Sequence, residues 1–366
     1  MSETSEDHLS DKGSGGSPVT DMSSMEREYV HAESLFHPSV FWEKLRQKNI
    51  HWLSHYGFES FKRTVNNNYF NWMVSLSSPY LYRMLLAYLK RNRFNPKAIA
   101  ALITTNLSVK GLHTTYISDK TRLRWIDRKL YAIYLLCLND YVEAVDTASL
   151  FYVLQEPLLG DPIAMEVGGR RVSQDICNSY LEYAYFVDVV AGIERPVIAE
   201  IGGGYGRLFY VIATLMAGKS KRLIMIDIPP ALHLSQWYLS SLFPDLRIFM
   251  WRPFEDYVDV AAQIENSDIA FLLPHQLQLL PDRSIDLLIN ISSFQEMNLK
   301  QIHRYYELID VKARNFYTKQ WLHWNNPEDN TSMPAVVYPT RPAWNIVKAG
   351  VNPVHKEFFE AIFEIP

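Results

Sequence analysis

The chain has 366 residues, of which 48% are hydrophobic, and a formal net charge of -4 at pH 7. This length and composition predict a globular protein with a sizeable core in one large or two medium domains. The slight acidity disfavours a dedicated nucleic-acid binder, and two cysteines are too few for a disulfide framework or a cysteine metal site.

Cellular location follows from what the sequence lacks. The start of the chain has no apolar signal core, and no apolar run approaches the roughly 18 residues of a membrane span. The low use of cysteine favours a reducing compartment. We therefore expect a cytoplasmic protein without an integral membrane segment.

The first half of the chain divides by composition. Residues 1–35 form a predicted disordered tail, acidic and rich in Ser and Gly, because so few apolar side chains cannot offset chain entropy. Residues 36–194 are rich in aromatics with helical spacing, as in residues 80–90 and 130–138. They predict a helical N-terminal domain or cap.

Residues 195–366 alternate between predicted strands and helices. Apolar runs occur at residues 197–201, 223–227, 269–274, 285–291 and 315–319. Continuous apolar runs are typical of parallel strands buried on both faces. The pattern therefore predicts an α/β fold with a Rossmann-like doubly wound sheet, and a ligand site at the carboxyl ends of its first strands. Residues 358–365 alternate enough for a half-exposed terminal strand.

A glycine motif follows the first of these strands. Gly202, Gly204 and Gly206 come directly after Glu200 and precede a helix, and Asp227 ends the next apolar run. An acid about 20 residues past such glycines is suited to binding the two hydroxyls of a ribose. The spacing is G-x-G-x-G rather than the G-x-G-x-x-G of dinucleotide sites, which disfavours a pyrophosphate ligand.

A phosphate loop is also not supported, because residues 218–220 (GKS) follow the helix instead of preceding it. The remaining candidate is a ligand with a ribose but no phosphate. Glu200 would repel a pyrophosphate, yet it can pair with the amino group of an amino acid. S-adenosylmethionine carries both an amino acid and a ribose. The alternative is a glycine-rich turn in an ordinary α/β protein.

Further motifs lie in residues 226–230 (IDIPP), 289–297 (INISSFQEM), 317–321 (YTKQW), 326–330 (NPEDN) and 338–342 (YPTRP). Together with residues 200–208, they resemble the class I S-adenosylmethionine-dependent methyltransferases and, more closely, a bacterial family of sugar O-methyltransferases. The resemblance covers about residue 174 to the end of the chain.

The resemblance implies where the cofactor S-adenosyl-L-methionine binds. The glycine loop would line its methionine part, Asp227 its ribose and Ile228 its adenine, and His275 and Gln276 stand where a commoner Asp meets the adenine edge. At the end of the fourth strand, Asn290, Ser292 and Ser293 would lie beside the sulfonium. The implied cofactor-binding residues are Glu200, Gly202, Gly203, Gly204, Gly206, Asp227, Ile228, His275, Gln276, Asn290 and Ser292.

A sugar hydroxyl is a poor nucleophile, so methyl transfer to it should be helped by a base within hydrogen-bond reach. Glu296 is the first candidate and His275 the second. The alternative for Glu296 is an acid that stabilises the start of the next helix. Ser293, Lys319 and Trp321 are candidate substrate-binding residues. Lys319 could contact the sugar, pair with Glu296 or be a surface lysine, and Trp321 could stack on a sugar or belong to the core.

Three functions remain open at this stage. The leading prediction is an O-methyltransferase that acts on a sugar hydroxyl of a glycoconjugate, nucleotide sugar or glycosylated metabolite. The others are a small-molecule N- or phenolic O-methyltransferase and a non-catalytic methyltransferase-like binding protein. We expect a small-molecule or glycan partner, no nucleic acid and no metal, and exposed aromatics in the helical region would allow a homodimer.

Overall fold

The computed structural model describes residues 22–37, 39–65, 74, 76–108, 113–114, 121–122, 125–325 and 332–366. The NPEDN motif at residues 326–330 lies outside this set. The helices are α1 (Met22–His31), α2 (Val40–Tyr56), α3 (Pro79–Arg91), α4 (Pro96–Thr104), α5 (Trp125–Val145), α6 (Gln174–Val190), α7 (Arg207–Leu215), α8 (Pro229–Leu242), α9 (Ala261–Asn266) and α10 (Leu299–Lys312). Short 3₁₀ turns are η1 (Ser34–Phe36), η3 (Phe151–Val153), η4 (Tyr257–Asp259), η5 (Pro274–Leu279), η6 (Phe294–Glu296) and η7 (Ala335–Val337).

The strands form one large sheet in the order β13-β14-β10-β9-β5-β6-β8-β7. They are β5 (Val197–Ile201), β6 (Arg222–Ile226), β7 (Ile248–Phe249), β8 (Ile269–Leu272), β9 (Leu287–Ile291), β10 (Asn315–Trp321), β13 (Asn345–Val351) and β14 (Phe358–Glu364). Within the described ranges, two-stranded sheets pair β1 (His113–Thr114) with β2 (Thr121–Arg122), β3 (Met165–Val167) with β4 (Arg170–Val172), and β11 (His323–Asn325) with β12 (Ser332–Pro334).

Neighbouring strands from β10 to β7 run parallel. β14 pairs antiparallel with both β10 and β13. The inner strands β8 and β9 are buried at every residue, as continuous apolar runs require. The predicted α/β fold class, a Rossmann-like doubly wound sheet, is therefore confirmed.

Strand β5 is the point where the strand order reverses. The chain builds β6, β7 and β8 on one side of β5, and it returns to build β9 and β10 on the other side. In such sheets the ligand crevice lies outside the carboxyl ends of the strands that flank the reversal. The loops after β5 and β9 are therefore the expected floor of a binding site.

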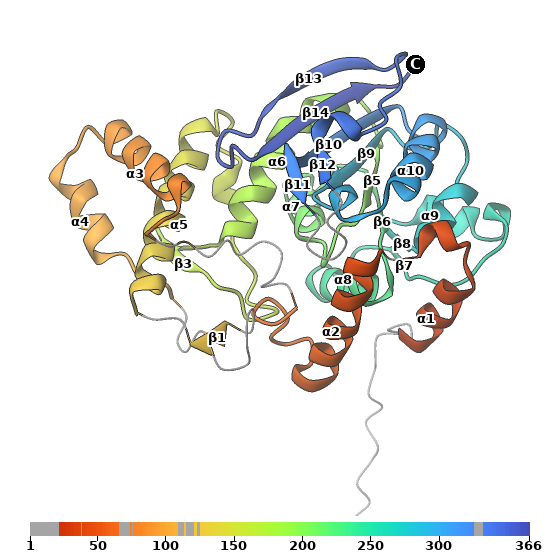
Figure 1. The fold of residues 1–366 in the computed structure, drawn as a ribbon, viewed down its shortest axis with the longest axis horizontal. Helices are drawn as coiled ribbons and strands as arrows, with labels where there is room; N and C mark the ends of the chain where they lie inside the picture. The colour runs from red at the N-terminus through yellow and green to blue at the C-terminus, as the bar shows by residue number, and fades with distance from the viewer. Residues whose placement is uncertain are drawn as a thin grey trace, which may run out of the picture.

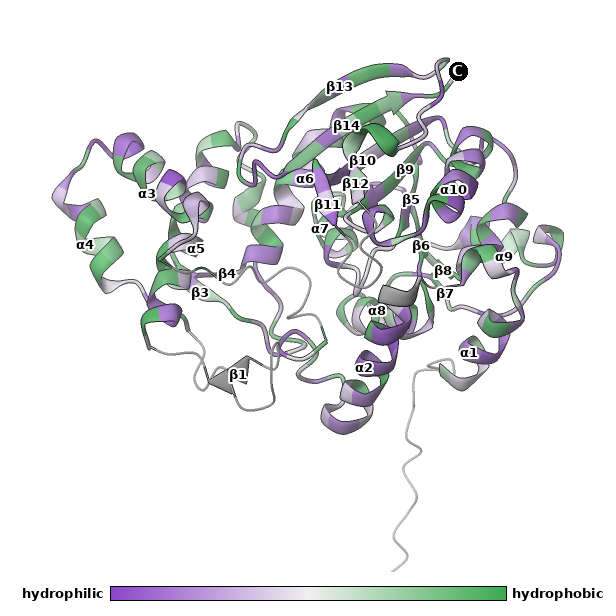
Figure 2. Ribbon diagram, in the orientation of Figure 1, coloured by the Kyte–Doolittle hydropathy of each residue, from purple (hydrophilic) through white to green (hydrophobic). Residues whose placement is uncertain are grey.

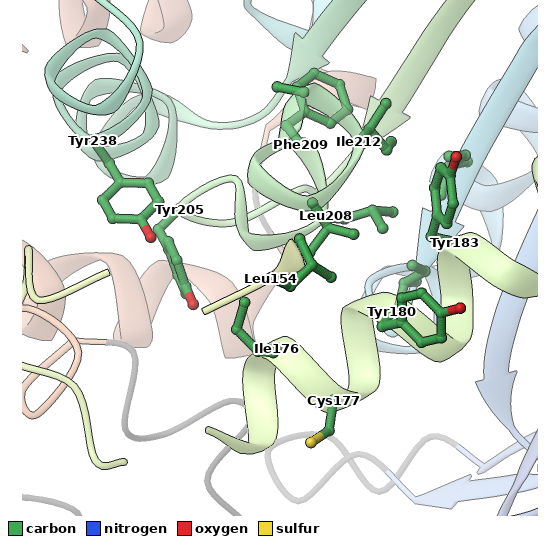
Figure 3. Close-up of a cluster of buried hydrophobic side chains, with 14 of the residues drawn as sticks. Leu154, Ile176, Cys177, Tyr180, Tyr183, Tyr205, Leu208, Phe209, Ile212 and Tyr238 are labelled. Carbon is green, nitrogen blue, oxygen red and sulfur yellow. The ribbon is translucent and has the colours of Figure 1, made fainter. Parts of the chain in front are cut away.

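Helices α6, α7 and α8 share one apolar cluster. Figure 3 shows Ile176 of α6 and Tyr205 of the glycine loop, with Leu208 of α7 and Tyr238 of α8 nearby. Each of these side chains is buried. This packing fixes the glycine loop between helices that come from both halves of the chain.

The N-terminal segment differs from the predicted disordered tail of residues 1–35. Residues 1–21 lie outside the described set, but α1 begins at Met22 and packs beside α8, and η1 packs on α10 (Figure 1). Met25 and Tyr29, four residues apart on one face of α1, are buried. Two apolar side chains are too few to give a clear helical pattern in the sequence. The stability of α1 comes from its packing on the domain rather than from the helix itself.

The region of residues 36–194 is mainly helical, with the β3–β4 hairpin inside it. Figure 1 shows α3, α4 and α5 on one side of the molecule, away from β6 to β8. Figure 2 shows mainly hydrophobic residues along α4, where Ile99 and Ile103 are exposed. Within the described part of the chain, no helix combines the length and apolar character needed to cross a bilayer. The domain division at residue 195 stays a prediction.

Candidate functional site

A pocket lies at the carboxyl ends of β5, β6 and β9. Gly202 and Gly204 line it from the β5 loop, Asp227 from the end of β6, and Ser292 and Ser293 from the end of β9. The space between atoms in this pocket is about 910 Å³, part of it open to solvent.

The glycine loop has little room for side chains. A Cβ on Gly202 would lie 2.5 Å from Ser293 Oγ, and the backbone there has φ +73°, so that only glycine fits without strain. Gly204 also has positive φ, but a Cβ on it would meet open space. The backbone of this loop can therefore approach a ligand closely.

Gly203 and Gly206 lie on the side of the loop that packs against the protein rather than on the pocket side. A Cβ on Gly203 would lie 2.4 Å from Met225 Sδ, and one on Gly206 would lie 2.8 Å from Leu239 Cδ1. Neither residue lines the pocket. Their role in this structure is to let the loop pack against β6 and α8.

Asp227 is held by the backbone. Its Oδ2 accepts a hydrogen bond from Gly204 N at 2.8 Å, and its Oδ1 accepts one from Ile228 N at 2.7 Å. Burial raises the pKa of Asp227 to about 7, although these two hydrogen bonds oppose the shift. Asp227 and Ile228 both line the pocket, so the carboxyl group can accept hydrogen bonds from a vicinal diol.

Glu200 lies behind the glycine loop, buried and outside the lining of the pocket. Burial raises its pKa to about 8, with Arg207 lowering it and the acids Glu182 and Asp227 raising it further. Among the described residues, its Oε2 atom has no hydrogen-bond partner. A cation bound at the loop would stabilise the ionised form of this carboxyl group.

Glu296 lines the same pocket from η6 and is 8% exposed. Burial raises its pKa to about 8, and a hydrogen bond with the Trp42 side chain partly opposes this shift. Its Oε2 atom has no hydrogen-bond partner within the described ranges. A carboxyl group of this kind can accept a proton from a ligand at mildly alkaline pH. It ends a 3₁₀ turn three residues before α10, so it is not in the first turn of that helix.

The end of β9 is fixed by hydrogen bonds to β5. Asn290 donates to Ile201 O at 2.9 Å and to Ser293 Oγ at 2.5 Å, and it accepts from Gln320 Nε2. Asn290 is fully buried and structural here, not part of the pocket lining. Ser292 does line the pocket and has φ +54°, a strained conformation for a residue other than glycine.

The N-terminal segment covers the pocket. Tyr29, Phe36 and Trp42 contribute aromatic lining from α1, η1 and α2. Ser39 Oγ donates to Glu296 O at 2.6 Å, which fixes the start of α2 against the site. Gln301 of α10 donates through Nε2 to His37 O, a second anchor of this cover.

His275 and Gln276 do not line the pocket. His275 Nε2 lies 3.6 Å from Glu28 Oε1 on α1, and burial lowers the pKa of the imidazole. Gln276 is fully buried, where it accepts from Leu273 N and donates to Arg252 O. The structure therefore gives both residues structural contacts and does not bring His275 to the site as a base.

Lys319 differs from each of its expected roles. It is buried, and its Nζ lies 2.9 Å from Glu182 Oε1, not beside Glu296. Trp321 also lies outside the pocket lining, with its ring 4.8 Å from that of Phe358. Trp321, the predicted sugar-stacking residue, is thus not part of the aromatic lining of the pocket.

The sequence motifs do not identify the pocket-lining residues that come from the N-terminal segment and from α10. Phe36 and Trp42 precede Gly202 by 166 and 160 residues, and no local motif connects them to the glycine loop. The one available indication is a cluster of aromatic side chains within otherwise polar segments. The missed pocket-lining residues are Tyr29, Phe36, His37, Ser39, Trp42, Asn49, Val65, Tyr205, Ala231, Leu234, Ile291, Met297, Gln301 and Tyr305.

The chain matches no protein-family model and no curated protein sequence. Among solved structures it is similar to the PH0226 protein of Pyrococcus horikoshii OT3, at 10% identity and a TM-score of 0.35, over 52% of this chain and 91% of that one. It is similar to a SAM-dependent methyltransferase from Aquifex aeolicus, at 13% identity and a TM-score of 0.30, over 50% of this chain and 88% of that one. A third similar structure is the mitomycin 7-O-methyltransferase MmcR, at 9% identity and a TM-score of 0.33, over 52% of this chain and 57% of that one.

Proposed function

We propose that the protein is an S-adenosylmethionine-dependent O-methyltransferase that transfers a methyl group to a sugar hydroxyl of a glycoconjugate, nucleotide sugar or glycosylated metabolite. The observation that carries this proposal is that two carboxyl groups, those of Asp227 and Glu296, line the same pocket. Asp227 can hold a ribose, and Glu296 can serve as a base. A glycine-rich turn without function would have no reason to place both there.

The residues present fit S-adenosylmethionine in charge. Glu200, Asp227 and Glu296 are buried carboxyl groups with raised pKa values at or beside the pocket. Within the described ranges, the pocket lining has no Lys or Arg to balance them. A ligand with an ammonium and a sulfonium would supply the missing positive charge. In this proposal Gly202 and Gly204 bind the methionine part, Asp227 the ribose and Ile228 the adenine.

The cofactor supplies an electrophilic methyl group bonded to positively charged sulfur. The residues of the pocket would position an acceptor oxygen next to that methyl group, and such positioning provides a large part of the rate. Glu296 would accept the proton of the acceptor hydroxyl, while a bound cofactor would supply the methyl group and leave as S-adenosylhomocysteine. The cover formed by α1, η1 and α2 limits the access of water to the pocket. Base catalysis of this kind contributes a factor of about 10² to 10⁴.

A second candidate is methylation of a phenolic oxygen. The aromatic side chains of Tyr29, Phe36, Trp42 and Tyr305 line the pocket and would suit a flat aromatic acceptor. A phenol ionises more readily than a sugar hydroxyl, so it depends less on Glu296. A nitrogen acceptor would also need less help from a base.

The cytoplasmic location and a homodimer stay predictions from the sequence.

The test is methyl transfer from S-adenosylmethionine with a labelled methyl group to three acceptor panels: p-nitrophenyl hexosides and UDP-hexoses, substituted catechols, and small amines. We expect label on a sugar hydroxyl together with an equal amount of S-adenosylhomocysteine. Label on catechols or amines alone would replace the sugar assignment with the second candidate. Tight cofactor binding without transfer to any panel would favour a non-catalytic binding protein.

A further inference from the structure

We infer that Asn49 of α2 is a binding residue for the acceptor, and that the acceptor is an uncharged glycoside with a second hydroxyl beyond the one that reacts. This inference rests on the proposed function and narrows its substrate class. It excludes nucleotide sugars, which the proposed function still allows. The observations that carry it are the state of the Asn49 amide and the charges around the pocket.

Asn49 is 6% exposed, yet it lines the pocket. Its Oδ1 atom has no hydrogen-bond partner among the described residues. A buried amide without a partner destabilises a protein, and most such groups in native structures are hydrogen-bonded. Asparagine is also a poor helix former in the interior of α2. An amide that costs stability and faces a pocket is best explained by a ligand that hydrogen-bonds to it.

The position of Asn49 relative to Glu296 sets the size of that ligand. Trp42, seven residues earlier on α2, hydrogen-bonds with Glu296. Seven residues are about two helical turns, so Asn49 and Trp42 lie on the same face of α2 with Cα atoms about 10 Å apart. A ligand that reaches both Glu296 and Asn49 therefore extends past a single hydroxyl. A glycoside with its reacting hydroxyl at Glu296 can place another hydroxyl at Asn49 Oδ1.

The charges of the side chains that line the pocket disfavour a phosphorylated acceptor. Asp227 and Glu296 line the pocket, and within the described ranges no Lys or Arg side chain does. A diphosphate needs cationic or backbone donors, and two nearby carboxyl groups would repel it. The backbone donors of the glycine loop are assigned to the cofactor. An uncharged acceptor avoids this repulsion.

The first test needs no acceptor. We expect Asn49→Leu to raise the Tm of the ligand-free protein by about 1–3 °C, because it removes an unpaired buried amide. His51→Leu is the matched control, since His51 is exposed on the same helix and has a similar helix propensity. A fall in Tm for Asn49→Leu, or failure to fold, while His51→Leu stays near wild type, would show that Asn49 has a structural partner and would overturn the inference.

The second test compares acceptors. We expect wild-type protein to methylate p-nitrophenyl hexosides with a higher kcat/KM than the matching UDP-hexoses. Asn49→Leu should raise KM for the hexoside about 10-fold, the loss of one hydrogen bond, with kcat within a factor of about two. An unchanged KM, or a preference for UDP-hexoses, would overturn the inference. Failure of the proposed function is seen separately, as absence of S-adenosylmethionine binding by wild type and by both variants.

Discussion

Replacing Glu296 with Gln should lower kcat by a factor of about 10² to 10⁴ and leave cofactor affinity within a few-fold of wild type. Gln has the same shape, and it can keep the hydrogen bond with Trp42, but it cannot accept the acceptor's proton. The measurement is initial rates with a saturating hexoside, with cofactor affinity determined by calorimetry on the same preparations. Glu307→Gln is the matched control, because Glu307 is on the exposed side of α10.

The pH profile gives a second check on Glu296. Burial raises the pKa of its carboxyl group to about 8, so the base is largely protonated at pH 6 and ionised above pH 8. We expect kcat of the wild type to rise with pH through this range, and the residual rate of Glu296→Gln to lack that rise. A variant with wild-type kcat, or a flat wild-type profile, would remove Glu296 as the base and favour a phenolic or nitrogen acceptor.

Replacing Glu182 with Ala should have the largest effect on stability. Glu182 is 1% exposed and binds Arg207 at 2.5 Å and Lys319 at 2.9 Å. Removing it leaves two buried cations without their carboxylate, which costs about 3–5 kcal/mol. We expect Tm to fall by roughly 5–15 °C in thermal unfolding. Glu307→Ala, which breaks only an exposed pair with Arg304, should change Tm little.

This stabilisation has a defined pH dependence. Burial alone would raise the pKa of Glu182, but Arg207 and Lys319 outweigh it and hold the pKa below its ordinary value of 4.5. A group whose pKa is lowered by folding stabilises above its unfolded pKa and loses that contribution as pH falls through its folded pKa. The difference in Tm between wild type and Glu182→Ala should therefore be full at pH 7 and shrink below pH 4. A difference that does not change between pH 7 and 3 would contradict the role of the charge.

The ion pairs of Glu182 with Arg207 and Lys319 also explain why the sequence does not predict the contacts of Lys319. Its position at the end of a strand was identified, but Glu182 lies on a helix 137 residues earlier. Nothing in the local sequence links the two residues. Pairing of this kind depends on how α6 packs beside the sheet, which is a long-range property.

The floor of the site could be predicted because its residues are local to strand ends. Gly202, Gly204 and Asp227 each follow an apolar run within a few residues, and parallel strands bring these ends to one edge. Glu296 follows β9 for the same reason. The cover could not be predicted, since Trp42 and Asn49 reach the pocket only through the docking of α2 on the domain.

Helix α1 shows a second reason why part of the structure could not be predicted from the sequence. Its sequence is mostly polar, with Met25 and Tyr29 as its buried side chains. Propensity and composition favour disorder for such a segment. The packing of α1 on α8, together with that of η1 on α10, stabilises it. The exposed strand β13 also has no clear pattern in the sequence. Its adjacent apolar residues Ile346 and Val347 break the alternation that is typical of a half-buried strand.

The central claim is that this pocket binds S-adenosylmethionine through Asp227, and calorimetric titration with S-adenosylmethionine and S-adenosylhomocysteine tests it most directly. We expect micromolar binding of both ligands by wild-type protein and its loss in Asp227→Ala. Affinity should strengthen as pH rises through about 7, where Asp227 becomes ionised. Absence of binding by folded wild-type protein, or equal binding by Asp227→Ala, would contradict the account.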